Sequence, residues 1–454
     1  MTQRKQVHSP RRHLPLFSSP DPLRPIAFRM GRSISLAEVR EDVGRFAASL
    51  PASRGFLVNL CEDRYLFLVA YCAAIARGWT NLLPPTRAQH VVDQVAGTHV
   101  GSFQCRDAAV VGALSGEPSD LAIPTEVGGD HVAMIGFTSG STGVPQAFPK
   151  QCWSLAGATA RSSAAIHARL SGRFGDARPW IVATVPPQHM YGLEMSILLP
   201  ALGDMAVHCD RPMFPQDVAG ALADVPEPRV LVTTPVHLRV LSESGIRFPD
   251  TALIMSATAP LDAGEAASAE RAFHSTLLEI FGSTETCALA QRRTAIDEPW
   301  HLRQGAKLEP GEDGTVVEAP WLPGPVNLQD VIELVSEGQF RLRGRNSDLV
   351  EVAGKRASLG DLTRRLSSVP GVIDAAVIQL DPVSSGVRRI AALAVAPGLT
   401  APQVLARLRN LIDPVFLPRP LILVASIPRN ELGKLPRQSV IDALARVQRE
   451  DDRH

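Results

Sequence analysis

Apolar residues recur with helical and strand spacing in alternation along the first part of the chain. Residues 36–50 have the spacing of a helix, residues 56–60 form a short apolar run typical of a strand, and residues 64–76 form an apolar helix that closes before Gly78. This alternation predicts α/β layering, in which helices cover a sheet.

The same alternation continues through the middle of the chain. We expect a helix over residues 153–170 and strands over residues 180–185, 230–233 and 252–255. Pro, His or small polar residues follow each strand, and such strand ends are where α/β sheets bind ligands. Residues 299–326 are rich in Gly, Pro and charge with little period, which predicts a small β-subdomain with irregular loops.

A compact α+β unit is predicted after Gly344. Its expected strands and helices, the first helix with Ser358 as N-cap, are residues 349–352, 359–368, 372–378, 389–395, 402–412 and 421–427. The chain is therefore expected to have a disordered start (1–20), a large domain (21–343), a hinge (344–348) and a C-terminal domain (349–454).

Composition indicates an ordinary globular protein of two domains. The 454 residues are 45% hydrophobic and 20% charged, and Lys+Arg and Asp+Glu both total 46. This balance gives no basic field that would attract nucleic acid or a membrane surface. Residues 344–454 differ, because they hold 16 Lys and Arg residues against 11 Asp and Glu residues, a net charge of +5.

Targeting and redox signals favour a cytoplasmic location. The basic N-terminus lacks a following apolar segment, so it does not read as a signal peptide, and no stretch of 18 apolar residues is present to span a bilayer. The six cysteines include no C-x-x-C pair, which favours reduced core thiols and argues against a zinc site.

The most informative segment is residues 137–145, Phe-Thr-Ser-Gly-Ser-Thr-Gly-Val-Pro. It follows an apolar stretch at residues 131–136 with the character of a buried strand, so we expect its hydroxyls on a loop that leaves a sheet. Hydroxyl groups and unshielded glycine N–H groups suit a polyphosphate, whereas an ordinary Ser/Thr/Gly turn is the alternative. The order of a Walker P-loop is absent, which disfavours a kinase or GTPase.

This run resembles the phosphate loop of the adenylate-forming superfamily, which contains acyl- and aryl-CoA ligases, peptide adenylation domains and luciferases. Further segments resemble the family's motifs in the family's order, over nearly the whole chain: 186–193 (PPQHMYGL), 256–261 (SATAPL), 281–285 (FGSTE), 344–348 (GRNSD), 354–356 (GKR) and 428–434 (PRNELGK).

The resemblance implies a large N-terminal α/β adenylate-forming domain with a small β-subdomain, followed by a small mobile α+β C-terminal domain. It also implies a reaction. A carboxylate attacks the α-phosphate of ATP to give acyl-AMP and pyrophosphate, and a thiol then captures the acyl group. Because both reactants are anionic, Mg²⁺ and a positioned ammonium would neutralise the charge that develops at phosphorus.

The resemblance also assigns roles to individual residues. Lys434 matches the catalytic lysine, although most lysines are simply solvated surface residues. Glu285 matches the Mg²⁺-binding glutamate, and Thr284 is expected to assist catalysis beside it. The implied nucleotide-binding residues, with Phe281 stacking on adenine and Asp330 and Arg345 at the ribose, are Thr138, Ser139, Gly140, Ser141, Thr142, Gly143, Ser256, Phe281, Gly282, Ser283, Asp330 and Arg345. Those implied for the acid substrate are His189, Tyr191, Gly192, Ala257 and Thr258.

Some positions depart from the family's pattern. The phosphate loop usually continues Pro-Lys-Gly, but this chain has Gln146 after Pro145, and the next basic residue is Lys150, which is expected to substitute from a longer loop. Ser347 stands at the hinge position that usually carries Asp or Lys, and Glu351 stands where many members have Lys. These changes affect the expected domain rotation more than adenylation. Asp330 also lacks the Thr-Gly that usually precedes it.

The loop spacing up to Lys150 and the following Trp153 most resemble short bacterial ligases of aryl-polyene and xanthomonadin-type pigment synthesis. Those enzymes activate a hydroxylated aromatic acid for an acyl carrier protein. Two alternatives stay open: a ligase that uses free CoA, and a noncatalytic nucleotide-binding relative, which the changes at Gln146 and Ser347 favour but the presence of Glu285 and Lys434 opposes.

Overall fold

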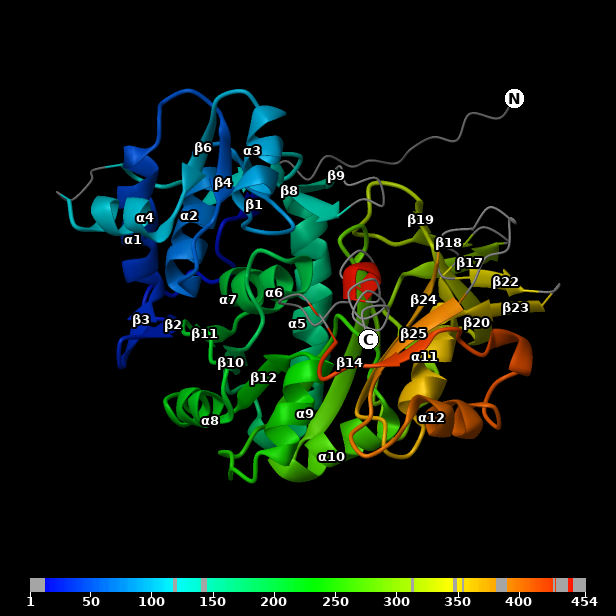
Figure 1. The fold of residues 1–454 in the computed structure, drawn as a ribbon. Helices are drawn as coiled ribbons and strands as arrows, with labels where there is room; N and C mark the ends of the chain where they lie inside the picture. The colour runs from blue at the N-terminus through cyan, green and yellow to red at the C-terminus, as the bar shows by residue number, and fades with distance from the viewer. Residues whose placement is uncertain are drawn as a thin grey trace. The chain divides into compact units, whose positions relative to one another are not determined.

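The computed structural model describes residues 13–116, 121–139, 145–311, 314–345, 349–352, 355–380, 390–427, 429 and 440–443. By its internal contacts the chain forms two compact units (Figure 1). The first contains residues 1–298, 302–306 and 319–324, and the second contains residues 299–301, 307–318 and 325–454. This division does not test where a hinge lies, so a hinge at 344–348 stays a prediction.

One sheet of the first unit has the strand order β6-β4-β5-β8-β9. The strands are β4 (Phe56–Asn59), β5 (Thr80–Leu83), β6 (Ser102–Cys105), β8 (Val132–Ser139) and β9 (Pro145–Gln151). The helices that lie around this sheet in Figure 1 are α1 (Leu36–Ser49), α2 (Arg64–Ala76), α3 (Gln89–Gly97) and α4 (Asp107–Leu114). The predicted helix at 36–50 is therefore confirmed, and it begins with a capping box between Ser35 and Glu38.

In the first unit's other sheet the strands follow the order β15-β14-β13-β12-β10-β11-β2-β3. They are β2 (Pro25–Arg29), β3 (Arg32–Ser35), β10 (Trp180–Ala183), β11 (Ala206–His208), β12 (Arg229–Thr233), β13 (Leu253–Ser256), β14 (Thr276–Ser283) and β15 (Cys287–Arg292). Strands β10 to β14 pair in parallel, as the alternation of helices and strands predicts.

Helices cover this second sheet. An apolar cluster joins one of its faces to α8 (Pro215–Ala223), α9 (Pro235–Glu243) and α10 (Ala263–Phe273), which Figure 1 shows in green. The long α5 (Cys152–Phe174) contacts β9 of the first sheet and β15 of the second. Between β10 and β11 the chain forms α6 (Met190–Leu193), the π-helix η1 (Glu194–Leu198) and α7 (Leu199–Leu202).

The second unit consists of small sheets and two described α-helices. Its strand groups run β20-β21-β16, β17-β18-β19, β22-β23 and β24-β25-β26. The strands are β16 (Trp300–Leu302), β17 (Lys307–Gly311), β18 (Gly314–Glu318), β19 (Val326–Leu328), β20 (Asp330–Ser336), β21 (Gln339–Arg345), β22 (Leu349–Val352), β23 (Lys355–Ser358), β24 (Asp374–Gln379), β25 (Ile390–Val395) and β26 (Leu421–Leu423). The helices are α11 (Leu359–Ser367), α12 (Ala401–Leu408) and the short 3₁₀ helix η3 (Pro414–Phe416).

Two local predictions need correction. The start of the chain is not disordered as far as residue 20, because β1 (His13–Pro15) pairs with β7 (Glu126–Gly128), and Leu16 and Phe17 are buried. Burial of these apolar side chains offsets the entropy of ordering the segment. The predicted strand at 421–427 is shorter, since β26 ends at Leu423.

The predicted fold class and the predicted reduced cysteines are confirmed. The fold is mixed α/β with a smaller C-terminal unit, and the six cysteines, all among the described residues, are buried free thiols. No helix in the described ranges is long and apolar enough to cross a membrane.

Candidate active site

The carboxyl ends of four parallel strands lie in one row in the first unit. The register places Thr233 of β12 beside Ser256 of β13, and Ser256 beside Glu279 of β14. Just beyond β10, the Thr184 and Thr233 hydroxyls are 3.0 Å apart. The predicted residues Ala257 and Thr258 directly follow β13, so they stand at the sheet edge where α/β proteins bind ligands.

Strand β14 reaches this edge and turns back sharply into β15. A register shift follows Phe281, and a Cβ atom on Gly282 would overlap the carbonyl oxygen of Cys287. Cys287 itself has a left-handed φ of 59°. The close approach of these two backbones explains why the Phe-Gly-Ser-Thr-Glu segment needs glycine at its second position.

Hydrogen bonds fix the turn that carries Thr284 and Glu285. The Ser283 and Thr286 hydroxyls are 3.1 Å apart, and the Ser283 N–H donates to Thr286 Oγ1 at 3.1 Å. The buried Trp321 indole donates to the Thr286 carbonyl at 2.8 Å, and Lys150 Nζ donates to the Glu285 carbonyl. The backbone of the turn is thereby held on several sides.

The strand that carries Thr138 lies directly against this turn. A Cβ atom on Gly136 of β8 would come within 2.9 Å of Thr284 Cγ2. Glycine at this position therefore lets Thr284 approach the strand that enters the phosphate loop. The structure therefore brings together the strand that carries Thr138 and the Thr284–Glu285 turn, which are about 150 residues apart in sequence.

The loop itself needs two corrections. Thr138 and Ser139 belong to β8, and Thr138 pairs with Gln146 of β9, so the strand continues beyond the predicted end at Gly136. Lys150 also stands on β9 and not on a long loop. Backbone pairing in the hairpin favours this extension over the expected loop. Gly140, Ser141, Thr142 and Gly143 lie outside the described residues.

The predicted acid-binding segment begins directly after β10. A Cβ atom on Gly192 would overlap the Pro186 carbonyl oxygen, which explains the glycine, and His189 is the N-cap residue of α6. The buried Arg64 guanidinium donates to the carbonyls of Ala183 and Val185, both at 2.9 Å. The entry to the segment is thus anchored from α2.

Two buried polar atoms at this edge, Gln188 Oε1 and Ser256 Oγ, lack a hydrogen-bond partner among the described residues. Burial raises the pKa of the nearby Tyr191 hydroxyl, and a hydrogen bond with the Thr233 backbone offsets part of that rise. Since buried polar atoms normally have a partner, Gln188 Oε1 and Ser256 Oγ are open to a hydrogen bond from a bound group.

Backbone strain marks the same edge. Thr258 has φ of 83°, which is unusual for a β-branched residue and costs on the order of 1–3 kcal/mol. Such strain persists where the surrounding structure holds it, and it concentrates at functional sites.

A buried polar network behind the turn escaped the sequence analysis. Glu194 of η1 accepts from the Ala288 N–H at 3.0 Å and from the Ser162 hydroxyl, and Arg303 Nη1 donates to Ser162 Oγ at 2.5 Å. Nothing local in the sequence marks these residues as partners, since they come from distant segments. The glutamate directly after the His-Met-Tyr-Gly-Leu run is the one available signal.

The second unit contains the remaining predicted residues. Asp330 on β20 is buried and pairs in register with Arg345 on β21, so the backbone places these two expected ribose-binding residues side by side. Lys434 lies outside the described residues.

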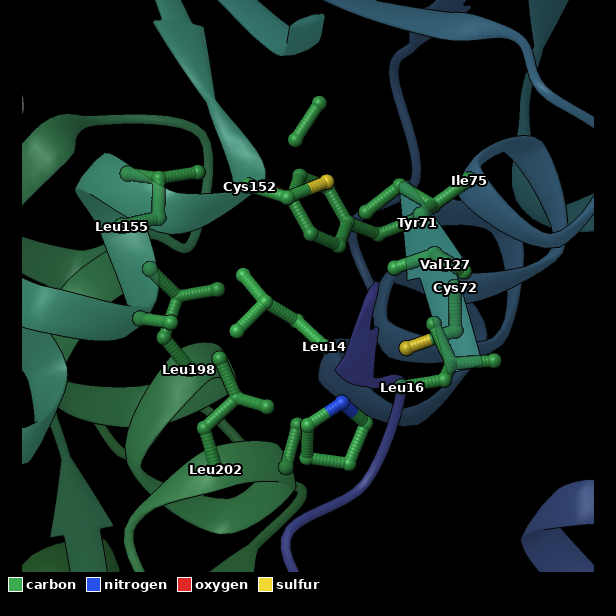
Figure 2. A pocket seen from close by; sticks show the side chains of 14 residues that line it. Leu14, Leu16, Tyr71, Cys72, Ile75, Val127, Cys152, Leu155, Leu198 and Leu202 are labelled. Carbon is green, nitrogen blue, oxygen red and sulfur yellow. The ribbon is translucent and has the colours of Figure 1, made fainter. Parts of the chain in front are cut away.

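A separate apolar pocket lies elsewhere in the first unit (Figure 2). In the view, Leu155, Leu198 and Leu202 stand on one side of Leu14, and Ile75 and Cys72 stand on the other. The Tyr71 hydroxyl beside it is buried without a partner among the described residues. None of the predicted site residues lines this pocket.

Comparison with known proteins identifies the chain's relatives. Residues 55–318 match the family described as AMP-binding enzyme. A 4-coumarate–CoA ligase of Halorhodospira halophila is 30% identical over 322 residues, which are 67% of this chain and 75% of that protein. A probable 2-succinylbenzoate–CoA ligase of Mycobacterium tuberculosis is 27% identical over 385 residues, covering 72% and 92%.

The solved structures support the fold. The Bacillus subtilis o-succinylbenzoate CoA synthetase, in complex with its acyl-adenylate intermediate, superposes with a TM-score of 0.77. The match covers 94% of this chain and 98% of that structure at 17% sequence identity.

The crowding at Gly282 gives a test of the turn's construction. We predict that Gly282→Ala lowers the free energy of unfolding by about 1–3 kcal/mol, because Cβ would displace the Cys287 backbone. The matched control is Gly220→Ala on an exposed face of α8, where an added Cβ meets no atom within 4 Å. That change is expected to preserve or raise stability by up to about 1 kcal/mol. Urea unfolding of both variants makes the comparison, and equal stabilities would contradict the proposed crowding.

Proposed function

Because this chain belongs to the AMP-binding enzyme family, we propose that it activates an aromatic carboxylic acid with ATP and passes the acyl group to a thiol. The observation that carries the proposal is the packing of the Thr284–Glu285 turn against Gly136 of the strand that enters the phosphate loop. This packing gathers hydroxyl groups, a carboxylate and the start of a glycine-rich loop where a triphosphate would bind.

Glu285 is the residue proposed to hold Mg²⁺. Its side chain is partly exposed, and among the described residues no group pairs with its carboxylate. One carboxylate supplemented by water and phosphate oxygens is the usual protein contribution to a Mg²⁺ site, so this residue fits the ion. When bound, Mg²⁺ would neutralise phosphate charge, while Thr138 and Thr284 offer hydroxyl donors to the reacting groups.

The acid is proposed to carry an aromatic ring with a hydroxyl or similar polar group. The unpartnered Gln188 and Ser256 atoms support this class, because a polar substituent or its bound water can satisfy buried donors and acceptors. The relatives named for 4-coumarate and 2-succinylbenzoate also support an aromatic acid. An assignment to pigment synthesis rests only on the resemblance in the phosphate-loop region.

The acceptor is proposed to be a phosphopantetheine thiol, which occurs both in CoA and on acyl carrier proteins. The CoA ligases among the relatives favour CoA. The net charge of +5 at residues 344–454 favours an acidic carrier protein. However, Arg364 and Arg365 of α11 both pair with Asp361, at 3.0 and 2.8 Å, so these two cations already have an acidic partner within the chain.

Three residues of the second unit complete the proposal. Lys434 would supply the ammonium that stabilises charge at the α-phosphorus, and Asp330 with Arg345 would bind the ribose. Asp330 and Arg345 are neighbours across β20 and β21, which supports a shared role.

The direct test is acid-dependent release of pyrophosphate from ATP with Mg²⁺. We predict that 4-hydroxybenzoate or 4-coumarate supports release at least about tenfold faster than dodecanoate, because a buried site that must satisfy polar atoms discriminates against a purely apolar chain. Benzoate controls for the ring without the hydroxyl. A preference for dodecanoate contradicts the aromatic assignment, and no release with any acid contradicts adenylation and favours a noncatalytic nucleotide-binding protein.

The proposed role of Lys434 predicts a separation of the two half-reactions. Lys434→Ala is expected to slow pyrophosphate release by roughly 100-fold or more, because a donor to developing phosphate charge is lost. Transfer from supplied acyl-AMP to the thiol is expected to stay within a few-fold of the wild-type rate, since this step breaks the acyl C–O bond and leaves the bonds of the α-phosphorus intact. Rapid-quench assays measure both steps. Equal damage to both steps would contradict the assignment.

Competition between acceptors separates the two thiol sources. With CoA and a phosphopantetheinylated carrier protein at equal concentration, we predict faster acylation of CoA, as the relatives suggest. If the carrier protein instead reacts faster, and Arg364→Glu with Arg365→Glu slows its acylation in a salt-dependent way, the carrier is the acceptor. If the carrier protein is acylated more slowly than CoA, and the two substitutions do not change its rate, CoA is the acceptor.

A further inference from the structure

Lys150 is the buried lysine of the described chain, with 4% of its surface exposed. It stands on β9 opposite Met134 of β8, and its Nζ donates to the carbonyl oxygen of Glu285. A contact is thus made between the sheet that carries the phosphate loop and the turn that carries the proposed Mg²⁺ ligand.

A buried ammonium requires compensation for the hydration that it loses. Among the described residues, no carboxylate forms an ion pair with Lys150. The Glu285 carbonyl oxygen is therefore the described group that replaces part of the hydration lost by the Lys150 ammonium.

Lys150 cannot reproduce the loop lysine that Gln146 replaces. Residues 146 and 150 lie on the same face of β9, four residues apart, which separates them by about 13 Å in an extended strand. Gln146 is exposed and follows the predicted phosphate loop closely in sequence, whereas Lys150 is buried and donates to the Glu285 carbonyl of the turn. The geometry therefore favours an indirect action through Glu285.

We infer that Lys150 is a positioning residue, which fixes the Glu285 backbone so that its carboxylate and the Thr284 hydroxyl are held at the phosphate-binding edge. The inference rests on the proposed function, because it gives that site a supporting cation on the opposite side of the turn. Mutation of a side chain that orients a metal ligand typically costs about 10- to 100-fold in metal affinity or activity.

The first experiment compares Lys150→Met with Lys307→Met, which removes an exposed lysine on β17. We expect Lys150→Met to raise the Mg²⁺ concentration for half-maximal pyrophosphate release by roughly tenfold or more. It should also lower kcat by about 10- to 100-fold, because the reacting groups lose their alignment. Lys307→Met should match the wild type in both quantities.

The second experiment needs neither metal nor turnover. Hydrogen–deuterium exchange of the nucleotide-free protein is expected to quicken in peptides covering residues 282–289 of Lys150→Met and to stay unchanged elsewhere. Unchanged exchange at this turn overturns the inference. General acceleration across the first unit also overturns it, since that pattern indicates only lost stability.

Two further variants test whether Lys150 positions the Glu285 backbone or instead supplies positive charge to the phosphates. Lys150→Arg keeps a donor for the Glu285 carbonyl and should recover part of the Mg²⁺ affinity. Gln146→Lys in the Lys150→Met background restores a loop cation and should not recover it. If Gln146→Lys restores the wild-type Mg²⁺ dependence, Lys150 serves as a charge for the phosphates and the positioning role fails.

The outcomes also separate this inference from the proposed function. If the wild type releases no pyrophosphate with any acid, the proposed function fails, while exchange at residues 282–289 still tests the contact. If the wild type is active and Lys150→Met retains its Mg²⁺ dependence, the proposed function stands and the role of Lys150 fails.

Discussion

The candidate active site depends on the hydrogen bonds that pair the backbone groups of one turn, residues 283–287. Residues 283–287 reverse β14 into β15 within a space so narrow that Gly282 has no room for a side chain. Lys150 and Trp321 donate hydrogen bonds to successive carbonyl oxygens of that turn. The Glu194 carboxylate accepts a hydrogen bond from the N–H group of Ala288, directly after the turn. Polar backbone groups that would otherwise be buried without partners are thereby bonded, which makes the turn rigid.

These partners come from separate parts of the first unit. Lys150 belongs to the sheet that carries the predicted phosphate loop, Glu194 to the π-helix that follows the predicted acid-binding segment, and Trp321 to the segment 319–324. Each buried charge carries a desolvation cost that a surface residue would avoid. Hydrogen bonds to this one turn therefore join the sheet of the predicted phosphate loop to the segment predicted to bind the acid.

Much of the fold could be predicted from the sequence because its signals are local. Apolar periodicity located α1 and three of the parallel strands, β10, β12 and β13. The roles of Lys150 and Glu194 could not be predicted, since they arise from contacts between residues 135 and 94 positions apart. The extension of β8 through Ser139 was missed for a related reason, because Ser and Gly composition indicates a turn while pairing with β9 is nonlocal.

Backbone strain and an unpartnered hydroxyl occur together at the strand ends where we propose that the acid binds. Thr258 is held at φ of 83°, and Ser256 just before it is fully buried with an unpartnered hydroxyl. A segment optimised for stability alone would replace Thr258 with glycine and give Ser256 a partner. Since the apolar cluster below β12 and β13 holds this edge in place, the strained backbone and the free hydroxyl remain available to a ligand without reorganisation. Preorganisation of this kind favours a rigid acid with fixed polar groups over a flexible chain, because the rigid acid loses less conformational entropy on binding.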